Sequence, residues 1–344
     1  MPLLRRSPDI TRLTRTLFNQ KSDLVPLIEL GIHPHIKSAI LGRPWQSLQD
    51  EIEFMSAMGY DFVKLQPQIQ ISLNQQKATD AGSTTPGSDR TWAPGSEGLI
   101  RDWADFEKYP WPEKNQIDYS KFEEIRSLLP EGMGVIGQYG DIFTLTWELM
   151  GFENFALSIY QNPDLVKAVM AKLSEVILEM FRAMSQMDWV NVLWYSDDIA
   201  YSSNLMVRPD FLRAQFFPIL KQIGDMAKSR HLPLIYHSDG LLWDVMDDII
   251  AAGVNALHPI EPKAMDLGEV KDRTRENLCL CGGIEVDLLA RGTVEAVTAL
   301  VKNWLENFAD EKGYCAGSSN SIPEYVNLDN YRAMLDTVLR FQGS

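Results

Sequence analysis

The sequence has no long apolar run, because charge or glycine interrupts each hydrophobic stretch well before the ~18 residues of a membrane span. We therefore expect no transmembrane helix. The N-terminal stretch has two early arginines but no sustained apolar segment and no small-residue cleavage site. This pattern predicts a cytoplasmic protein rather than a secreted one.

Cysteine and excess positive charge are also scarce. The three cysteines, Cys279, Cys281 and Cys315, cannot form a disulfide framework in 344 residues, so we expect a reducing compartment. A net charge of −15 disfavours nucleic acid or an anionic membrane as the main partner. It also weakly disfavours a polyanionic substrate, unless a local basic pocket overrides it.

What the chain does have is a regular alternation of strand-like and helix-like segments. The eight predicted strands are 24–30, 60–67, 134–141, 190–199, 232–240, 254–261, 278–285 and 313–320. Helical periodicity fills the intervals between several of them. Eight such repeats predict an α/β fold, a (β/α)8 TIM barrel forming a single domain over 1–344. A doubly wound open sheet shares this alternation, but no Gly-rich dinucleotide motif follows the first strand.

One long insertion, 68–133, follows the second predicted strand. Its first half is rich in Ser, Thr, Gly, Asp and Pro, which predicts a mobile loop. Since it leaves the C-terminal end of a strand, we expect it to cover the catalytic face; a disordered excursion is the alternative.

Barrel enzymes build their sites from the C-terminal ends of strands. The candidates there are Glu29, Lys64, Gln66, Gln138, Asp141, Asp197, Asp198, His237, Asp239, Glu261, Glu285, Cys315 and Ser318. Such a dense polar ring indicates an active site, although any one carboxylate could instead cap a helix or face solvent.

His237 and Asp239 form the most informative local motif, since residues i and i+2 of a strand point to the same face. With Cys315 from the last strand, they would offer the N, O and S ligands that zinc accepts, and Glu261 or water would be the fourth. The alternatives are a neutral hydrogen-bonded imidazole for His237 and a small buried hydrophobe for Cys315.

Other candidates have simpler interpretations. Cys279 and Cys281 sit mid-strand and are predicted to be core residues. Of the adjacent pair Asp197 and Asp198, only one is expected to face inward. His33 and His35 lie in a loop and are expected to be exposed.

The runs YHSDGLLWDVMDDIIAAGVNALHPIEPKAMDLGEVKDR and LCLCGGIEVDLLARGTVEAV resemble the uroporphyrinogen decarboxylase superfamily. So do DLVPLIELGIHPHIKSAILG and SIPEYVNLDNYRAML. The resemblance spans about 24–340 and implies a β/α barrel. The superfamily comprises cofactor-free decarboxylases of uroporphyrinogen and zinc-dependent methyltransferases that work with corrinoid proteins.

The decarboxylases carry an Arg-rich N-terminal segment, an Asp after the second strand and a His near the C-terminus. This sequence has LIELGIHPHIK, FVKLQP and GSSNSIP at those places, which argues against uroporphyrinogen decarboxylation. The methyltransferases carry a zinc-binding His-x-Cys pair and a distant Cys. His237 and Cys315 match two of those positions, and Asp239 replaces the middle Cys.

The resemblance thus implies demethylation of a small methylated substrate, such as a methoxyl compound, with a corrinoid protein as methyl acceptor. Zinc would be held by His237, Cys315 and Asp239 or Glu261. A tetrapyrrole-related decarboxylase and a non-catalytic tetrapyrrole- or corrinoid-binding barrel are the alternatives, and a homodimer is plausible. The expected catalytic residues are Asp197, Asp198, Glu29 and Lys64, and the expected substrate-binding residues are Gln138, Asp141, Tyr195, Glu285 and Ser318.

Overall fold

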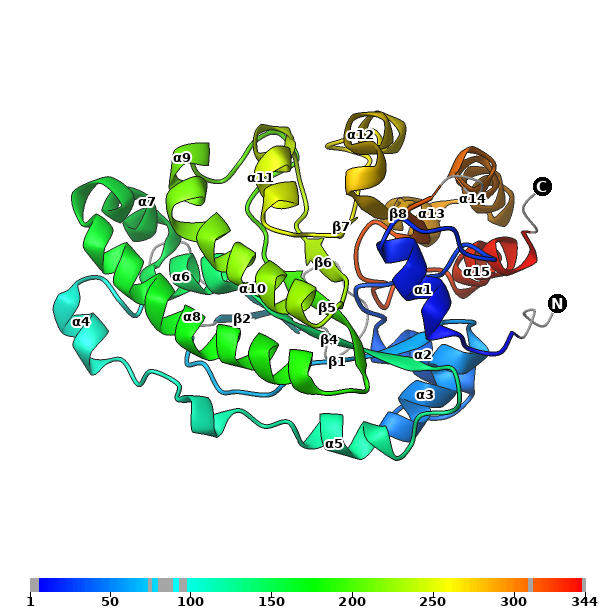
Figure 1. The fold of residues 1–344 in the computed structure, drawn as a ribbon, viewed down its shortest axis with the longest axis horizontal. Coiled ribbons are helices and arrows are strands. Elements are labelled where there is room, and N and C mark those ends of the chain that lie inside the picture. The colour runs from blue at the N-terminus through cyan, green and yellow to red at the C-terminus, as the bar shows by residue number, and fades with distance from the viewer. Residues whose placement is uncertain (1–5, 74–75, 80–88, 93–97, 309–311, 342–344) are drawn as a thin grey trace.

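A computed structural model describes residues 6–73, 76–79, 89–92, 98–308 and 312–341. Its centre is a seven-stranded parallel sheet in the order β1-β4-β5-β6-β7-β8-β9, which curls so that helices cover its outer side (Figure 1). The strands are β1 (Phe62–Leu65), β4 (Gly134–Gly140), β5 (Val190–Ser196), β6 (Leu234–His237), β7 (Ala256–His258), β8 (Cys279–Ile284) and β9 (Tyr314–Ser318). Nearly every strand residue is buried, as expected for a parallel sheet enclosed on both faces. The α/β architecture predicted from the sequence is confirmed.

Seven of the eight predicted strands are present, and the first one, 24–30, is not a full strand. It joins the sheet through an isolated parallel bridge between Leu27 and Ala316, and a second bridge joins Ile32 to Ile322. Pro26 has no N–H to donate to a ladder, but its carbonyl oxygen accepts from the Ala316 N–H at 2.9 Å. On its other side, a cavity of about 640 Å³ is lined both by this segment and by β1.

The helices follow the predicted alternation closely. They are α1 (Ile10–Leu17), α2 (Pro34–Leu41), α3 (Leu48–Ala57), α4 (Trp103–Lys108), α5 (Ser120–Arg126), α6 (Ile142–Met150), α7 (Phe152–Gln161), α8 (Pro163–Gln186), α9 (Pro209–Phe211), α10 (Phe217–Ser229), α11 (Met246–Ala251), α12 (Leu267–Thr274), α13 (Val286–Arg291), α14 (Val294–Phe308) and α15 (Leu328–Arg340). Short 3-10 turns lie at Lys114–Gln116, Trp243–Val245 and Arg275–Asn277. None of the helices in the described ranges is long and apolar enough to cross a membrane.

The helical segment between β5 and β6 contains a π-helical turn, Leu212–Phe216. Pro218 follows this turn and cannot donate the backbone hydrogen bond that a regular α-helix requires at its position. The regular hydrogen-bond ladder is therefore interrupted here, and α10 begins directly after the π-helical turn, at Phe217.

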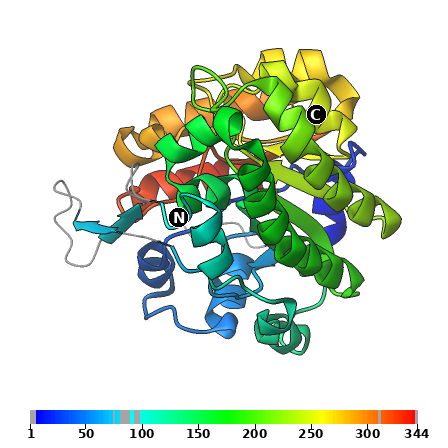
Figure 2. The ribbon, with the colours of Figure 1, turned by 90° about the vertical axis from the view of Figure 1, so that its left-hand side faces the viewer.

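The insertion 68–133 is more structured than its composition predicts. It contains an antiparallel hairpin of β2 (Gln76–Thr79) and β3 (Asp89–Trp92), then α4 and α5. Figure 2 shows the hairpin projecting from the side of the molecule. Residues 74–75, 80–88 and 93–97 of the insertion lie outside the described residues, and its role as a cover over the catalytic face stays a prediction.

Candidate active site

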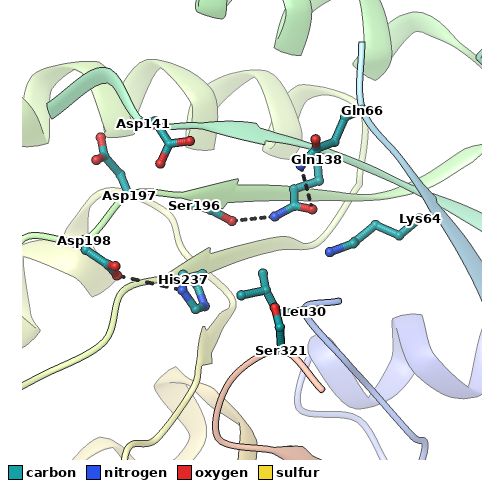
Figure 3. Close-up of a pocket in the computed structure, with 10 residues that line it drawn as sticks. All are labelled: Leu30, Lys64, Gln66, Gln138, Asp141, Ser196, Asp197, Asp198, His237 and Ser321. Carbon is teal, nitrogen blue, oxygen red and sulfur yellow. Dashed lines mark hydrogen bonds and ion pairs between the residues drawn. The ribbon is translucent and has the colours of Figure 1, made fainter. Parts of the chain in front are cut away.

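The polar residues at the strand ends surround a cavity of about 290 Å³ (Figure 3). Its wall consists of Leu30, Lys64, Gln66, Gln138, Asp141, Ser196, Asp197, Asp198, His237 and Ser321. Most of these come from β1, β4, β5 and β6 or from the residue just after each strand. Seven of the predicted strand-end residues therefore lie in one wall: Lys64, Gln66, Gln138, Asp141, Asp197, Asp198 and His237.

Three donor groups converge at one side of this cavity. Asp198, His237 and Asp239 each present a ligand atom, and these atoms lie within 4.8 Å of one another. His237 is the last residue of β6, and its Nε2 lies 3.8 Å from Asp198 Oδ1. The Asp239 N–H donates to the same Oδ1 at 2.8 Å, which holds the two turns together.

His237 is backed by a second imidazole, that of His258, which was not among the predicted site residues. The Nδ1 atoms of His237 and His258 are 2.8 Å apart, so one ring donates and the other accepts. Burial and the charge of Lys64 lower the pKa of His237 to about 3, and burial also keeps His258 neutral by lowering its pKa. His258 is the last residue of β7 and is in register with His237. Its position at a strand end is the sequence signal by which it could have been predicted.

Asp239 has one occupied and one unoccupied carboxylate oxygen. Oδ2 accepts from the side-chain amide of Asn320 at 2.7 Å, whereas the buried Oδ1 has no hydrogen-bond partner. Burial and the charges of Asp198 and Glu261 raise the pKa of Asp239 to about 7. Asn320 lies in the loop after β9, and no sequence signal singled it out.

Asp197 and Asp198 differ sharply, although both reach the cavity wall. The Asp197 carboxylate accepts from the N–H groups of Phe143 and Thr144, from Thr144 Oγ1 and from the Tyr195 hydroxyl, all within 3.0 Å. It thereby caps the start of α6, and only Asp198 has a carboxylate with room for another partner.

Tyr195 was expected to bind substrate, and that expectation is wrong. Its side chain is buried on the helix-facing side of β5, where it packs against Phe181 and Phe216. Trp194, the preceding residue, has the opposite orientation: its ring packs on His258 and lies 5.0 Å from Lys64 Nζ. The alternation of side chains along a strand explains the difference.

Cys315 does not join His237 and Asp239 as expected. Among the described residues, its Sγ groups with those of Cys279 and Cys281, inside the fold. Cys315 is the second residue of β9, which runs on to Ser318. At about 3.3 Å per residue, this places it roughly 10 Å short of the strand end. The two other cysteines are fully buried, as predicted.

The remaining predicted residues lie beside the cavity rather than in its wall. Glu261 accepts from the Gly240 N–H at 2.9 Å, and with Glu285 it lines a neighbouring cavity of about 370 Å³ that also contacts Asp239. Glu29 is buried and accepts from the backbone N–H and the hydroxyl of Ser318. His33 and His35 are exposed, as predicted.

A polar chain and two unusual ionisable groups complete the wall. Gln66 donates to Gln138 at 3.1 Å, and Gln138 donates to the Ser196 hydroxyl at 2.7 Å. Burial and the charge of Lys37 lower the pKa of Lys64 to about 7. Desolvation and the charges of Asp197 and Asp198 raise the pKa of Asp141 to about 8.

The family model for uroporphyrinogen decarboxylase (URO-D) matches residues 85–341. The chain belongs to the uroporphyrinogen decarboxylase family. It superposes on a methyltransferase from Methanosarcina mazei with a TM-score of 0.71 and 18% identity, over 95% of this chain and 97% of that one. That identity establishes a shared fold.

A second solved structure contains the GH20 catalytic modules of a pneumococcal exo-β-D-N-acetylglucosaminidase. It aligns at 11% identity over 94% of this chain and 85% of that one, with a TM-score of 0.44, and supports no argument. No curated protein sequence matches the chain.

Proposed function

We propose that this family member is a metal-assisted methyltransferase that removes a methyl group from a small methylated substrate, such as a methoxyl compound, and passes it to a corrinoid protein. One observation carries the proposal: Asp198, His237 and Asp239 bring their ligand atoms within 4.8 Å of one another at the edge of the cavity. The shared fold with the Methanosarcina mazei methyltransferase supports the same class of chemistry.

The donor set fits zinc. It offers one imidazole nitrogen and two carboxylate oxygens, which zinc accepts alongside an open position for substrate. The unpartnered Oδ1 of Asp239 is a buried acceptor that a cation would satisfy. When bound, zinc would supply Lewis acidity that polarises the methoxyl oxygen.

His258 would fix the tautomer that such a site needs. With Nε2 of His237 unprotonated toward the ligand atoms of the two carboxylates, its Nδ1–H donates to Nδ1 of His258. His258 then carries its proton on Nε2, a buried atom without a hydrogen-bond partner in the structure. His258 is thus a positioning residue for His237.

Asp141 is the residue best placed to supply a proton. Loss of the methyl group leaves the C–O electron pair on the substrate oxygen, which must take up one proton as the methyl moves to its acceptor. Asp141 lines the cavity, and its raised pKa of about 8 keeps its carboxyl protonated at neutral pH. This assignment moves the acid from Asp197, whose carboxylate already accepts four hydrogen bonds.

The substrate would be small, with few negative charges. The cavity of about 290 Å³ has three aspartates in its wall and one cation, Lys64, whose pKa is lowered to about 7. A substrate with several carboxylates would meet repulsion there, which disfavours decarboxylation of a tetrapyrrole. The Gln66–Gln138–Ser196 chain offers neutral hydrogen-bonding groups instead.

The test uses zinc and reduced cobalamin, with methanol and a set of methoxylated aromatic acids as donors. The purified protein is loaded with zinc, and methylcobalamin formation is followed by its absorbance. We expect methyl transfer from at least one donor. We also expect the protein with His237 intact to bind zinc. In the His237→Ala variant, zinc binding and methyl transfer should both be lost.

Asp197→Glu is unsuitable as a control because Asp197 caps α6, so an exposed pair far from the cavity is preferable. Lys221→Ala breaks the exposed ion pair with Asp225 on α10 and should retain both zinc and activity. Zinc retained by His237→Ala, or methyl transfer unchanged in that variant, would refute the proposal.

A further inference from the structure

The three cysteines of the chain form a cluster of their own, away from the proposed zinc site. Cys279 and Cys281 are alternate residues of β8 and so point to the same side of the sheet. Cys315 of β9 is in register with Cys281. The Sγ atoms of Cys279 and Cys315 are 3.8 Å apart, and all three Sγ atoms lie within 4.8 Å of one another.

The spacing suits a shared metal ion. Metal–thiolate bonds of about 2.3 Å place sulfur ligands about 3.8–4.0 Å apart, depending on whether the geometry is tetrahedral or trigonal. One pair is already at that distance, and the rest of the triangle needs to contract by less than about 1 Å. A disulfide needs sulfur atoms about 2.05 Å apart and would leave the third cysteine unused.

The ligand set distinguishes among metals. Within the described ranges, no histidine or carboxylate joins the three thiols, and all three side chains have zero exposure. Soft thiolate donors select Cu(I), zinc or iron–sulfur clusters, but structural zinc and iron–sulfur clusters almost always take four protein ligands, one more than this group offers. We propose that Cys279, Cys281 and Cys315 bind one Cu(I) ion as a three-coordinate thiolate centre inside the barrel.

Binding involves no change of oxidation state. Each sulfur that still carries a proton gives it up to solvent as it binds Cu(I). The two proposed metal sites then differ in their ligand atoms. The cysteine group offers sulfur for Cu(I), whereas Asp198, His237 and Asp239 offer nitrogen and oxygen for zinc. Neither site depends on the other, and this proposal stands apart from the proposed function.

Burial determines how the ion enters. All three cysteines have zero exposure in the folded chain, so part of the fold must open before an ion can pass. Cu(I) is therefore loaded while the chain folds and then exchanges slowly. A chelator added to the folded protein should remove it only as fast as the fold opens.

The experiment refolds the full chain from denaturant without oxygen, in the presence of Cu(I) as its acetonitrile complex or of Zn²⁺. After desalting against a chelator, metal per chain and the thermal unfolding midpoint are measured. We expect one Cu(I) per chain, a raised midpoint and little retained zinc. Copper added to already folded protein should bind far more slowly.

Variants separate the two sites. Cys281→Ala should lower retained copper about tenfold or more. Because a buried cysteine behaves as a small hydrophobe, the metal-free variant should keep the wild-type fold, checked by circular dichroism. Cys281→Ser is a second variant in case the alanine leaves a cavity. His237→Ala should retain copper fully.

Several results would overturn the proposal. They are no copper bound, copper unchanged in both Cys281 variants, or copper lost in His237→Ala. Zinc held in preference to copper would refute the three-coordinate assignment, and a disulfide in the protein refolded without oxygen would leave a single thiol and refute it as well.

Discussion

The carboxylate of Asp197 gives the sharpest test of how the site is built. It is almost fully buried, and four donors surround it: the N–H groups of Phe143 and Thr144, Thr144 Oγ1 and the Tyr195 hydroxyl. Asp197→Asn keeps the shape but replaces one acceptor oxygen with an NH₂ donor. That substitution should destabilise the fold.

The magnitude follows from what each donor can do. The hydroxyls of Tyr195 and Thr144 can rotate and accept from the new NH₂, but a backbone N–H cannot reverse. Whichever way the amide lies, either the Phe143 or the Thr144 N–H loses its acceptor. One orphaned N–H costs about 1–3 kcal/mol, and weakening the remaining charge-assisted bonds adds about 1 kcal/mol. We expect a loss of about 2–4 kcal/mol in the free energy of unfolding.

Urea unfolding at neutral pH, followed by circular dichroism, measures this loss. Asp198→Asn is the matched control. The Asp198 carboxylate is next in the chain, is half exposed and accepts one hydrogen bond, from the Asp239 N–H. It should change stability by less than about 1 kcal/mol, since the asparagine oxygen still accepts. Equal losses in the two variants would refute the argument that Asp197 caps α6.

Three further predictions concern ionisable groups of the site. His258→Leu should weaken zinc binding at His237 about 10–100-fold, measured by competition with a chromogenic chelator, and an unchanged affinity would exclude the positioning role. Burial raises the pKa of Glu29 from 4.5 to about 8, so the folded state keeps a proton that the unfolded chain releases, and stability falls as pH rises between those values. Glu29→Gln should flatten this fall in urea unfolding from pH 5 to 8; parallel curves for both proteins would contradict it. If Asp141 is the proton donor, methyl transfer should decline as pH rises past about 8, and Asp141→Asn should remove that decline along with most of the rate.

Strands were predictable from the sequence because fully buried parallel strands leave continuous apolar runs bounded by polar or Gly residues. Only 24–30 failed as a full strand, since its pairing extends no further than a bridge at Leu27. The π-helical turn before Pro218 was not predicted, because periodicity averages over a single irregular turn.

The site was predictable in its location but not in its ligand set. The strand ends led to the cavity wall, since parallel strands bring those ends together. Cys315 was taken as a strand-end residue, whereas it is the second residue of β9 and lies three residues before Ser318, where the strand ends.

Asn320 and His258 were missed for different reasons. Asn320 lies in a loop whose path depends on tertiary packing, and its contact with Asp239 spans 81 positions of the chain. His258 precedes a proline at the end of a three-residue strand, and its partner is apparent only once β6 and β7 are in register.

The cavity between the 24–30 segment and β1 allows the space for a substrate to change independently of the side chains proposed to bind metal. The cavity of about 640 Å³ there shares Leu30, Lys64, Gln66 and Gln138 with the candidate active site, yet none of Asp198, His237 and Asp239 lines it. Substitutions along this cavity can therefore enlarge or reshape the space for a substrate while the side chains proposed to bind metal stay in place at the ends of β5 and β6. In a family that shares one fold, the cavity between the 24–30 segment and β1 is a place where the range of substrates can diverge while the reaction stays the same.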